Sequence, residues 1–155
     1  MMKWLWLSGL ILILDQLSKI WINISMNLYQ SIPVFPGFSV TYAHNYGAAF
    51  SFLSDAGGWQ RWFFAALAAG ISIGLVIYLK SLKQDETLLA VSLSLILGGA
   101  IGNLIDRVIY GYVIDFLDVY YQAYHWPVFN IADSAITIGV AFMLYESLVV
   151  KDKHE

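Results

Sequence analysis

Cysteine is absent from this chain of 155 residues. Its absence excludes disulfide bonds, thiolate metal sites and a cysteine nucleophile, so any chemistry must use oxygen and nitrogen atoms. Charge is also scarce, because only 12% of the residues are Asp, Glu, Lys or Arg, whereas soluble domains average about 25%. A net charge of −3 and the lack of a basic run argue against nucleic acid as a partner.

Apolar residues make up 59% of the chain. Four apolar runs are long enough to approach, as helices, the ~30 Å hydrocarbon core of a bilayer. We therefore predict a mainly α, polytopic membrane protein with four transmembrane helices in a single domain, 1–155. The predicted spans are 4–22, 62–79, 87–105 and 128–150.

The first run resembles a secretory signal peptide because Lys3 precedes it. However, it contains Asp15 and Lys19 and lacks a small-residue cleavage site, so we predict a retained span. Pairs of glycines four residues apart in the second and third runs, Gly70 with Gly74 and Gly98 with Gly102, predict close helix packing.

The basic residues predict the orientation, because Lys and Arg are enriched in cytoplasmic loops. With four spans both termini share one side, and five of the eight basic residues lie on it. We predict cytoplasmic termini, with segments 23–61 and 110–127 as outer loops. The five residues are Lys3, Lys80, Lys83, Lys151 and Lys153.

The first outer segment contains Pro33, Pro36 and Gly37, followed by the run FSVTYAHNYGAAFSF. Aromatic and β-branched residues bounded by turn residues are typical of short strands. We predict a small extracytoplasmic β-rich cradle between the first two helices. Segment 110–127 is similarly aromatic, and we expect both outer loops to lie at the level of the lipid headgroups.

Ionisable residues inside the spans cost roughly 2.5–3.5 kcal/mol each on insertion scales, and so indicate a partner or a function. Asp15 and Lys19 are four residues apart, which predicts an ion pair within one helix; a structural role and a role in substrate contact both remain open. Asn103, Asp106 and Arg107 share one helix face. We expect Arg107 to bridge Asp106 and another carboxylate as part of a scaffold.

Two further aspartates lie in apolar surroundings. Asp133 precedes the run SAITIGVAFML, and Asn130 three residues earlier is a candidate N-cap after Pro127. Asp115 lies in the apolar segment VIDFLDVYY and would meet Asp133 if the last two helices are antiparallel neighbours. Close carboxylates tend to share one proton, which provides an acid and a base. Spacing alone leaves Asp118 as a rival to Asp115, although a loop aspartate such as Asp118 is more often solvated than catalytic.

Other chemistries fit the sequence less well. His44 and His125 lack the spacing of a zinc motif. Ser18 and Lys19 are adjacent, so on a helix they would not face each other as a hydrolase pair. A non-enzymatic membrane protein, such as a transporter subunit or a lipid-binding assembly factor, remains an alternative, but it would distribute polar groups through the membrane depth rather than cluster them at one end. We expect no metal and no cofactor.

Five segments in series resemble the lipoprotein signal peptidases, or signal peptidase II, which are bacterial aspartyl proteases of the inner membrane. The segments are DQLSK (Asp15–Lys19), NYGAAF (Asn45–Phe50), GGAIGNLIDR (Gly98–Arg107), VIDF (Val113–Phe116) and FNIADS (Phe129–Ser134). They occur in the order of the family and extend over most of the chain.

The resemblance implies that Asp115 and Asp133 are the catalytic pair, and so favours Asp115 over Asp118. It implies an endopeptidase that removes the signal peptide from diacylglyceryl-modified prolipoproteins, cutting just before the lipidated cysteine. Membrane lipids would be further partners, and the peptide antibiotics globomycin and myxovirescin would be inhibitors. The implied supporting residues are Asp15, Lys19, Asn45, Gly47, Asn103, Asp106, Arg107 and Asn130.

Overall fold

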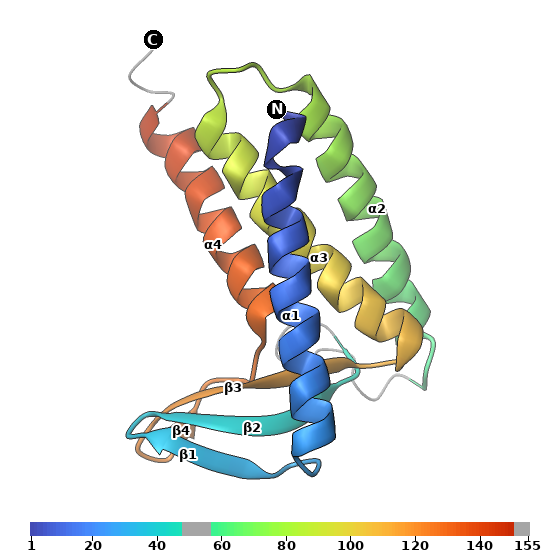
Figure 1. The fold of residues 1–155 in the computed structure, drawn as a ribbon, viewed down its shortest axis with the longest axis vertical. Helices are drawn as coiled ribbons and strands as arrows, with labels where there is room; N and C mark the ends of the chain where they lie inside the picture. The colour runs from blue at the N-terminus through green and yellow to red at the C-terminus, as the bar shows by residue number, and fades with distance from the viewer. Residues whose placement is uncertain (48–56, 151–155) are drawn as a thin grey trace.

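Four long helices lie beside one another and meet a small sheet at one end (Figure 1). The computed structural model describes residues 1–47 and 57–150. Predictions for 48–56, which include the end of NYGAAF, and for 151–155, with Lys151 and Lys153, fall outside the described residues. The helices are α1 (Leu5–Ser25), α2 (Gln60–Ser81), α3 (Thr87–Ile109) and α4 (Ile131–Tyr145); a 3₁₀ turn (Met2–Trp4) precedes α1 and a π-helical turn (Glu146–Val150) follows α4.

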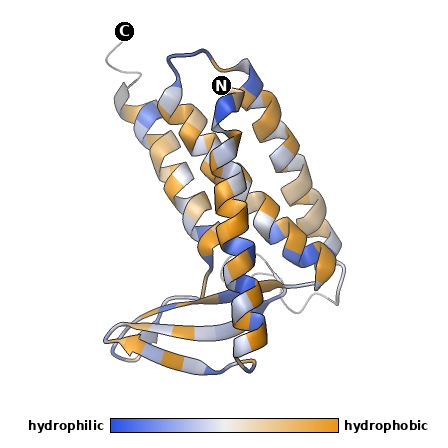
Figure 2. Ribbon diagram, viewed as in Figure 1, coloured by the Kyte–Doolittle hydropathy of each residue, from blue (hydrophilic) through white to orange (hydrophobic). Residues whose placement is uncertain are grey.

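The helices have the surface of membrane spans. All four are long and apolar enough to cross a membrane, and apolar residues cover most of their length (Figure 2). Trp6, Leu17 and Ile24 of α1 are each more than half exposed. An apolar surface of this extent is suited to lipid rather than to water, so the prediction of a polytopic, mainly helical membrane protein is confirmed.

Helix α3 forms the centre of the bundle, because it packs against α1, α2 and α4. Its glycines permit this packing: a Cβ at Gly98 would lie 2.8 Å from the carbonyl oxygen of Ser8, and one at Gly99 would collide with the carbonyl oxygen of Ala132. In α2, by contrast, no described atom lies within 4 Å of a Cβ built at Gly70 or Gly74. The expected close packing is therefore present in α3 and wrong for α2.

The sheet is antiparallel, in the order β1-β2-β3-β4. A hairpin of β1 (Ser31–Phe35) and β2 (Phe38–Asn45) turns at Gly37, which has a φ of +92° that L-residues with side chains rarely adopt. Strand β2 pairs with β3 (Val113–Tyr121), and β3 pairs with the short β4 (Tyr124–His125). The C-terminal end of α1 packs on the sheet through Ile22 and Met26, which contact Ile114 and Phe116.

The structure differs from the prediction at both ends of the last outer segment. Strands β3 and β4 both lie in 110–127, which we predicted to be a loop. The prediction missed β3 because its first four residues are all buried and therefore show no alternation of apolar and polar residues. Helix α4 begins at Ile131 rather than at Val128, because Asn130 caps it and the residues before Asn130 lie against β3.

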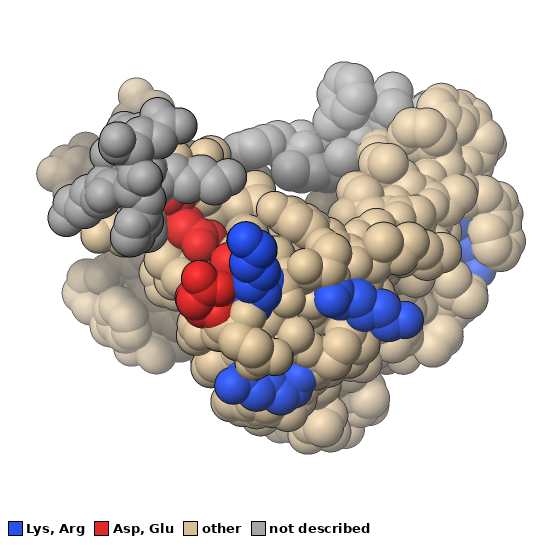
Figure 3. Space-filling view, turned by 90° about the horizontal axis from the view of Figure 1, so that it is seen from above, with Lys and Arg blue, Asp and Glu red and all other residues tan. Residues whose placement is uncertain are grey.

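The two ends of the bundle differ in character. The end that carries the N-terminus and the α2–α3 connection shows both basic and acidic side chains (Figure 3). Lys3 precedes α1, while Lys80 and Lys83 lie at the end of α2 and just beyond it. The sheet lies at the opposite end (Figure 1). These three lysines are therefore separated from the sheet by the length of the bundle.

Candidate active site

The polar residues singled out from the sequence converge where the helices meet the sheet. Helix α1 contributes Asp15 and Lys19, α3 contributes Asn103 and Asp106, β3 contributes Asp115, and the start of α4 contributes Asn130 and Asp133. Most are almost fully buried: the exposed fraction is at most 2% for Asp15, Lys19, Asp106, Asp115 and Asn130. Buried polar groups must satisfy one another, and a hydrogen-bond network does so here.

Lys19 is the centre of this network. Its Nζ lies 2.8 Å from Asp15 Oδ2 and 2.9 Å from Asp106 Oδ2, and it donates a hydrogen bond of 3.0 Å to Asn103 Oδ1. The three protons of the ammonium group thus have three acceptors. The predicted pair of Asp15 and Lys19 is present, extended by a second carboxylate from α3.

The two carboxylates around Lys19 also hold other elements in place. Asp15 accepts a hydrogen bond from the backbone N–H of Ala132 at the start of α4 (2.9 Å). Asp106 accepts one from the backbone N–H of Ile114 in β3 (3.1 Å) and one from Gln16 Nε2 (2.9 Å). Asp15 and Asp106 therefore tie α1 and α3 to α4 and β3, the two elements that carry Asp133 and Asp115. Gln16 has no signal of its own in the sequence beyond its place in DQLSK.

Asn103 connects Lys19 to Asp133. A lysine ammonium can only donate hydrogen bonds, so the Oδ1 atom of Asn103 must face Lys19. Its Nδ2 atom then points to Asp133 and donates a hydrogen bond of 2.8 Å to Oδ1. The position of Lys19 thus determines which end of the Asn103 amide meets the aspartate.

Asn130 connects the two aspartates. As the N-cap of α4 it accepts a hydrogen bond from the backbone N–H of Asp133 (2.9 Å), as predicted. Its Nδ2 atom donates to Asp115 Oδ1 at 2.7 Å. One amide therefore orients the Asp115 carboxyl group and ties it to the backbone of Asp133.

The Asp115 carboxyl group has an altered acidity. Burial, and after it the neighbouring charge of Asp133, raises its pKa to about 7, a shift that the side chains of Asn130 and Asn45 partly oppose. Near neutral pH this carboxyl group is therefore divided between its protonated and ionised forms. The two aspartates lie near each other because Asn130 bonds to the side chain of one and to the backbone of the other.

Arg107 has a different role from the one expected. Its Nη2 atom donates to the carbonyl oxygen of Gly47 (2.9 Å) and its Nη1 atom to the carbonyl oxygen of Asn103 (3.2 Å). Among the described residues it forms no ion pair, so the expected bridge to Asp106 is wrong; Lys19 occupies that carboxylate instead. Arg107 thus holds the chain just after β2, where the N–H of Gly47 also donates to Asn45 Oδ1 (3.0 Å).

Asp118 lies apart from the network. It is three residues from Asp115 in the same strand, and side chains an odd number apart point to opposite faces. Asp118 is buried and accepts hydrogen bonds from Thr41 and from His125, both at 2.8 Å, so the expectation of a solvated loop aspartate is wrong.

Neither His44 nor His125 contributes to a metal site in the described part of the chain, where no three His, Asp or Glu residues are arranged to hold an ion. His44 stacks on Tyr112, with 3.6 Å between the ring centroids, and hydrogen-bonds to the hydroxyl of Tyr42. His125 hydrogen-bonds to Asp118. Each histidine thus has a structural partner.

A cavity of about 570 Å³ lies beside the network. Asn45, Asn103, Arg107 and Asp133 line its polar end, and the remainder is mostly apolar, with lining residues that include Trp126, Phe129, Ile136 and Ile138. Ile138 is 48% exposed, so the cavity reaches the lipid-facing surface of α4. An apolar cavity with a few convergent polar groups is typical of a binding site for a partly apolar ligand.

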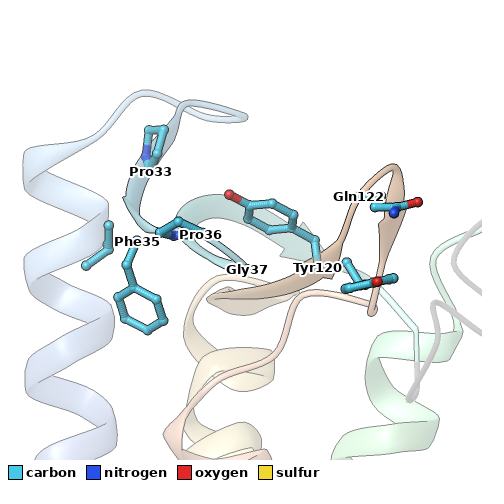
Figure 4. A pocket seen from close by; sticks show the side chains of 8 residues that line it. Pro33, Phe35, Pro36, Gly37, Tyr120 and Gln122 are labelled. Carbon is cyan, nitrogen blue, oxygen red and sulfur yellow. The ribbon is translucent and has the colours of Figure 1, made fainter.

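A second hollow, of about 660 Å³, lies at the far tip of the sheet between the β1–β2 turn and the β3–β4 turn (Figure 4). Pro33, Phe35 and Pro36 line it from the β1–β2 hairpin, and Tyr120 and Gln122 line it from the end of β3 and the turn that follows. No Asp, Glu, Lys or Arg lines this hollow. The first cavity, next to Asp133, is therefore the candidate active site.

The fold and the site together define a class of bacterial membrane enzyme. A bacterial membrane enzyme solved by the in meso method at 2.3 Å resolution superimposes with a TM-score of 0.86 and 34% identity, covering 99% of this chain and 90% of that one. A second, at 1.9 Å resolution, has a TM-score of 0.83 and 35% identity, covering 96% and 94%.

Comparison of the sequence then identifies the family within this class. The signal peptidase (SPase) II family model matches residues 7–149. Lipoprotein signal peptidases of Alteromonas mediterranea and Pseudoalteromonas translucida are each 54% identical over 98% of this chain, covering 84% and 92% of those proteins; that of Yersinia enterocolitica is 49% identical over 96% of the chain, covering 88% of that protein. The chain belongs to the signal peptidase II family and is a membrane peptidase.

Proposed function

We propose that this chain is an aspartic endopeptidase that cuts diacylglyceryl-modified prolipoproteins just before the lipidated cysteine, with Asp115 and Asp133 as its catalytic pair. The observation that carries the proposal is the position of Asn130, whose amide bonds to the Asp115 carboxyl group and to the backbone N–H of Asp133, while the Asp133 side chain lines the cavity. Family membership supports the peptidase reaction and the prolipoprotein substrate.

The proposed reaction needs only the two carboxyl groups and a water molecule. Ionised Asp133 takes a proton from the water, whose oxygen attacks the scissile carbonyl carbon, while protonated Asp115 donates a hydrogen bond and then its proton to the carbonyl oxygen. The resulting gem-diol collapses as the proton on Asp133 passes to the leaving nitrogen. The C–N bond breaks, and Asp115 regains its proton from the second hydroxyl. A pKa of about 7 lets Asp115 carry the proton that this role requires near neutral pH, and the two carboxyl groups titrate as one pair.

The cavity suits a substrate that arrives from the bilayer. Its apolar wall on α4 reaches the lipid-facing surface, and its polar end lies at Asp133. We propose that acyl chains of the precursor lie along the apolar wall while the scissile bond lies at the polar end. The sheet would then lie at the outer face of the bacterial inner membrane, with the lysine-bearing end and both termini in the cytoplasm. Globomycin and myxovirescin would bind in the same cavity.

The remaining residues of the five motif segments are proposed as supports for this pair. Lys19 with Asp15 and Asp106 braces the elements, Asn103 and Asn130 orient the two carboxyl groups, and Arg107 holds Gly47 and with it the end of β2. Asn45 would position Asp115 and the substrate backbone.

Lipid modification of the substrate should control cleavage. A precursor carrying the diacylglyceryl group should be cut at least about tenfold more efficiently than the same peptide with a free cysteine, because burying even a few CH₂ groups contributes about 0.8 kcal/mol each. The measurement is kcat/KM for both peptides in detergent micelles, with the cut position read by mass spectrometry. Equal cleavage would leave a peptidase but contradict the lipoprotein specificity; a cut elsewhere would contradict the proposed scissile bond.

The pH profile should show the proton of Asp115. Above its pKa of about 7 this carboxyl group loses the proton that it donates to the substrate, so kcat/KM should fall by about tenfold per pH unit on the alkaline side. On the acidic side the rate should fall as the ionised partner is protonated. The check is kcat/KM between pH 5 and 9, with the unfolding temperature measured at each pH as the control. A rate that stays flat to pH 9 in folded protein would contradict Asp115 as the acid.

A further inference from the structure

A chain of side-chain hydrogen bonds crosses all four strands on the face of the sheet that bears Asp118. The hydroxyl of Ser31 in β1 bonds to that of Thr41 in β2 (2.7 Å), and Thr41 donates to Asp118 Oδ2 in β3 (2.8 Å). Asp118 Oδ1 lies 2.8 Å from Nδ1 of His125 in β4. Since a carboxylate only accepts, His125 is the donor. The sequence shows no sign of this chain, because each member comes from a different strand.

His125, the last member of this chain of hydrogen bonds, lies next to a wall of the cavity beside Asp133. The segment Trp126–Phe129 directly follows His125, and all four of its residues line the cavity. Neighbouring side chains of an extended segment point to opposite faces, so His125 lies on the Asp118 face while Trp126 faces the cavity. The N–H of Trp126 donates to the carbonyl oxygen of Val119 (2.8 Å), which is the first backbone attachment of this wall.

The other end of the wall is held separately. Phe129 accepts backbone hydrogen bonds from Phe116 and Leu117 and donates one to Leu117, immediately before Asn130. Between the two attachments, Pro127 has no N–H to donate. A disturbance at His125 should therefore move Trp126 and its neighbour, whereas Asn130 and the two aspartates keep their positions.

We propose that Asp118 and His125 are positioning residues for substrate binding: their hydrogen bond holds the wall Trp126–Phe129 against β3 and so shapes the apolar side of the cavity. The ring of His125 also stacks on Tyr120, with centroids 5.0 Å apart, which keeps the imidazole in line with Asp118. The inference rests on the proposed function, because it takes the cavity to be the site of the lipid-modified precursor. It concerns affinity, since Asp115 and Asp133 are oriented by Asn103 and Asn130 instead.

The test is His125→Phe, which keeps a ring to stack on Tyr120 but removes the donor. His125 is half exposed, so the variant should fold. KM for the diacylglyceryl-modified precursor should rise about three- to tenfold, the size expected for the net loss of one partly exposed hydrogen bond, while kcat stays within about twofold. His125→Asn, which keeps a donor nitrogen near the position of Nδ1, should restore most of the affinity. Thr41→Val is the matched control, because it removes the other hydrogen bond of Asp118 without touching the wall, and KM should not change.

Hydrogen exchange provides a readout that does not depend on activity. In His125→Phe the amide of Trp126 should exchange faster, while the amide of Tyr42, which bonds to Gln30 in the first hairpin, should be unchanged. An unchanged KM in His125→Phe, or an equal rise in Thr41→Val, would overturn the proposal. Neither result would affect the proposed function, which fails instead if the Asp115 or Asp133 variants retain turnover.

Discussion

Replacing either Asp115 or Asp133 with asparagine should remove nearly all cleavage of a lipid-modified precursor. Each substitution removes one member of the acid–base pair, and positioned acid–base groups contribute about a hundred- to ten-thousandfold to a rate. The loss should appear in kcat, because both side chains act on the reacting atoms. The measurement is single-turnover cleavage of a diacylglyceryl-modified precursor in detergent, with the same protein checked for folding by thermal unfolding.

Asparagine is a suitable replacement because it preserves the local hydrogen bonds. At position 115 its oxygen can still accept from Asn130 Nδ2, and at position 133 it can still accept from Asn103 Nδ2. The comparison is Asp118→Asn, which changes an equally buried aspartate of the same strand. We expect it to keep its kcat, because Asp118 lies on the other face of the strand. Near-normal kcat in folded Asp115→Asn or Asp133→Asn would show that the pair is not catalytic.

Lys19→Met should strongly destabilise the protein. Lys19 is 1% exposed and lies between the carboxylates of Asp15 and Asp106. Methionine has a similar length but leaves two buried carboxylates without a counter-charge, and breaking a buried pair in this way costs about 3–5 kcal/mol. The quantity to measure is the free energy of unfolding in detergent. Lys80→Met, on the exposed end of α2, should change it by less than about 0.5 kcal/mol.

A second substitution separates lost charge from lost packing. If the cost of Lys19→Met is electrostatic, adding Asp15→Asn should recover part of the stability, because it removes one uncompensated charge. A double variant that is as unstable as the sum of the two single variants would indicate a packing defect instead. The single variant should also lose activity beyond its loss of stability, since Lys19 orients the Asn103 amide toward Asp133.

Local patterns were sufficient for the features that lie within one helix. Hydropathy located the four spans, the spacing of Asp15 and Lys19 predicted their ion pair, and the position of Asn130 predicted its cap. These features depend on helical periodicity and on neighbouring residues, both of which can be read directly from the chain. The family resemblance, confirmed by the family match, added what spacing could not provide, namely the preference for Asp115 over Asp118 as the proposed partner of Asp133.

Features that join distant segments could not be read in this way. Arg107 was expected to pair with Asp106, its neighbour on α3, but Lys19 from α1 occupies that carboxylate and Arg107 binds the carbonyl oxygen of Gly47. Asp118 was expected in solvent but lies under contacts from Thr41 and His125. In both cases the partner comes from another element that packs against the group. Helical or strand periodicity contains no information about which element that is.

The sequence by itself determined the class of the molecule, the number of its spans and the set of polar residues worth following, because the cost of placing charge in lipid leaves so few of them. The tertiary structure alone decided how they are connected. It placed β3 in the sheet, gave Lys19 acceptors from two helices and a link through Asn103 to Asp133, and brought Asn130 between that aspartate and Asp115. A buried polar group takes the partner that the packing of distant elements provides, and only the folded chain defines that packing.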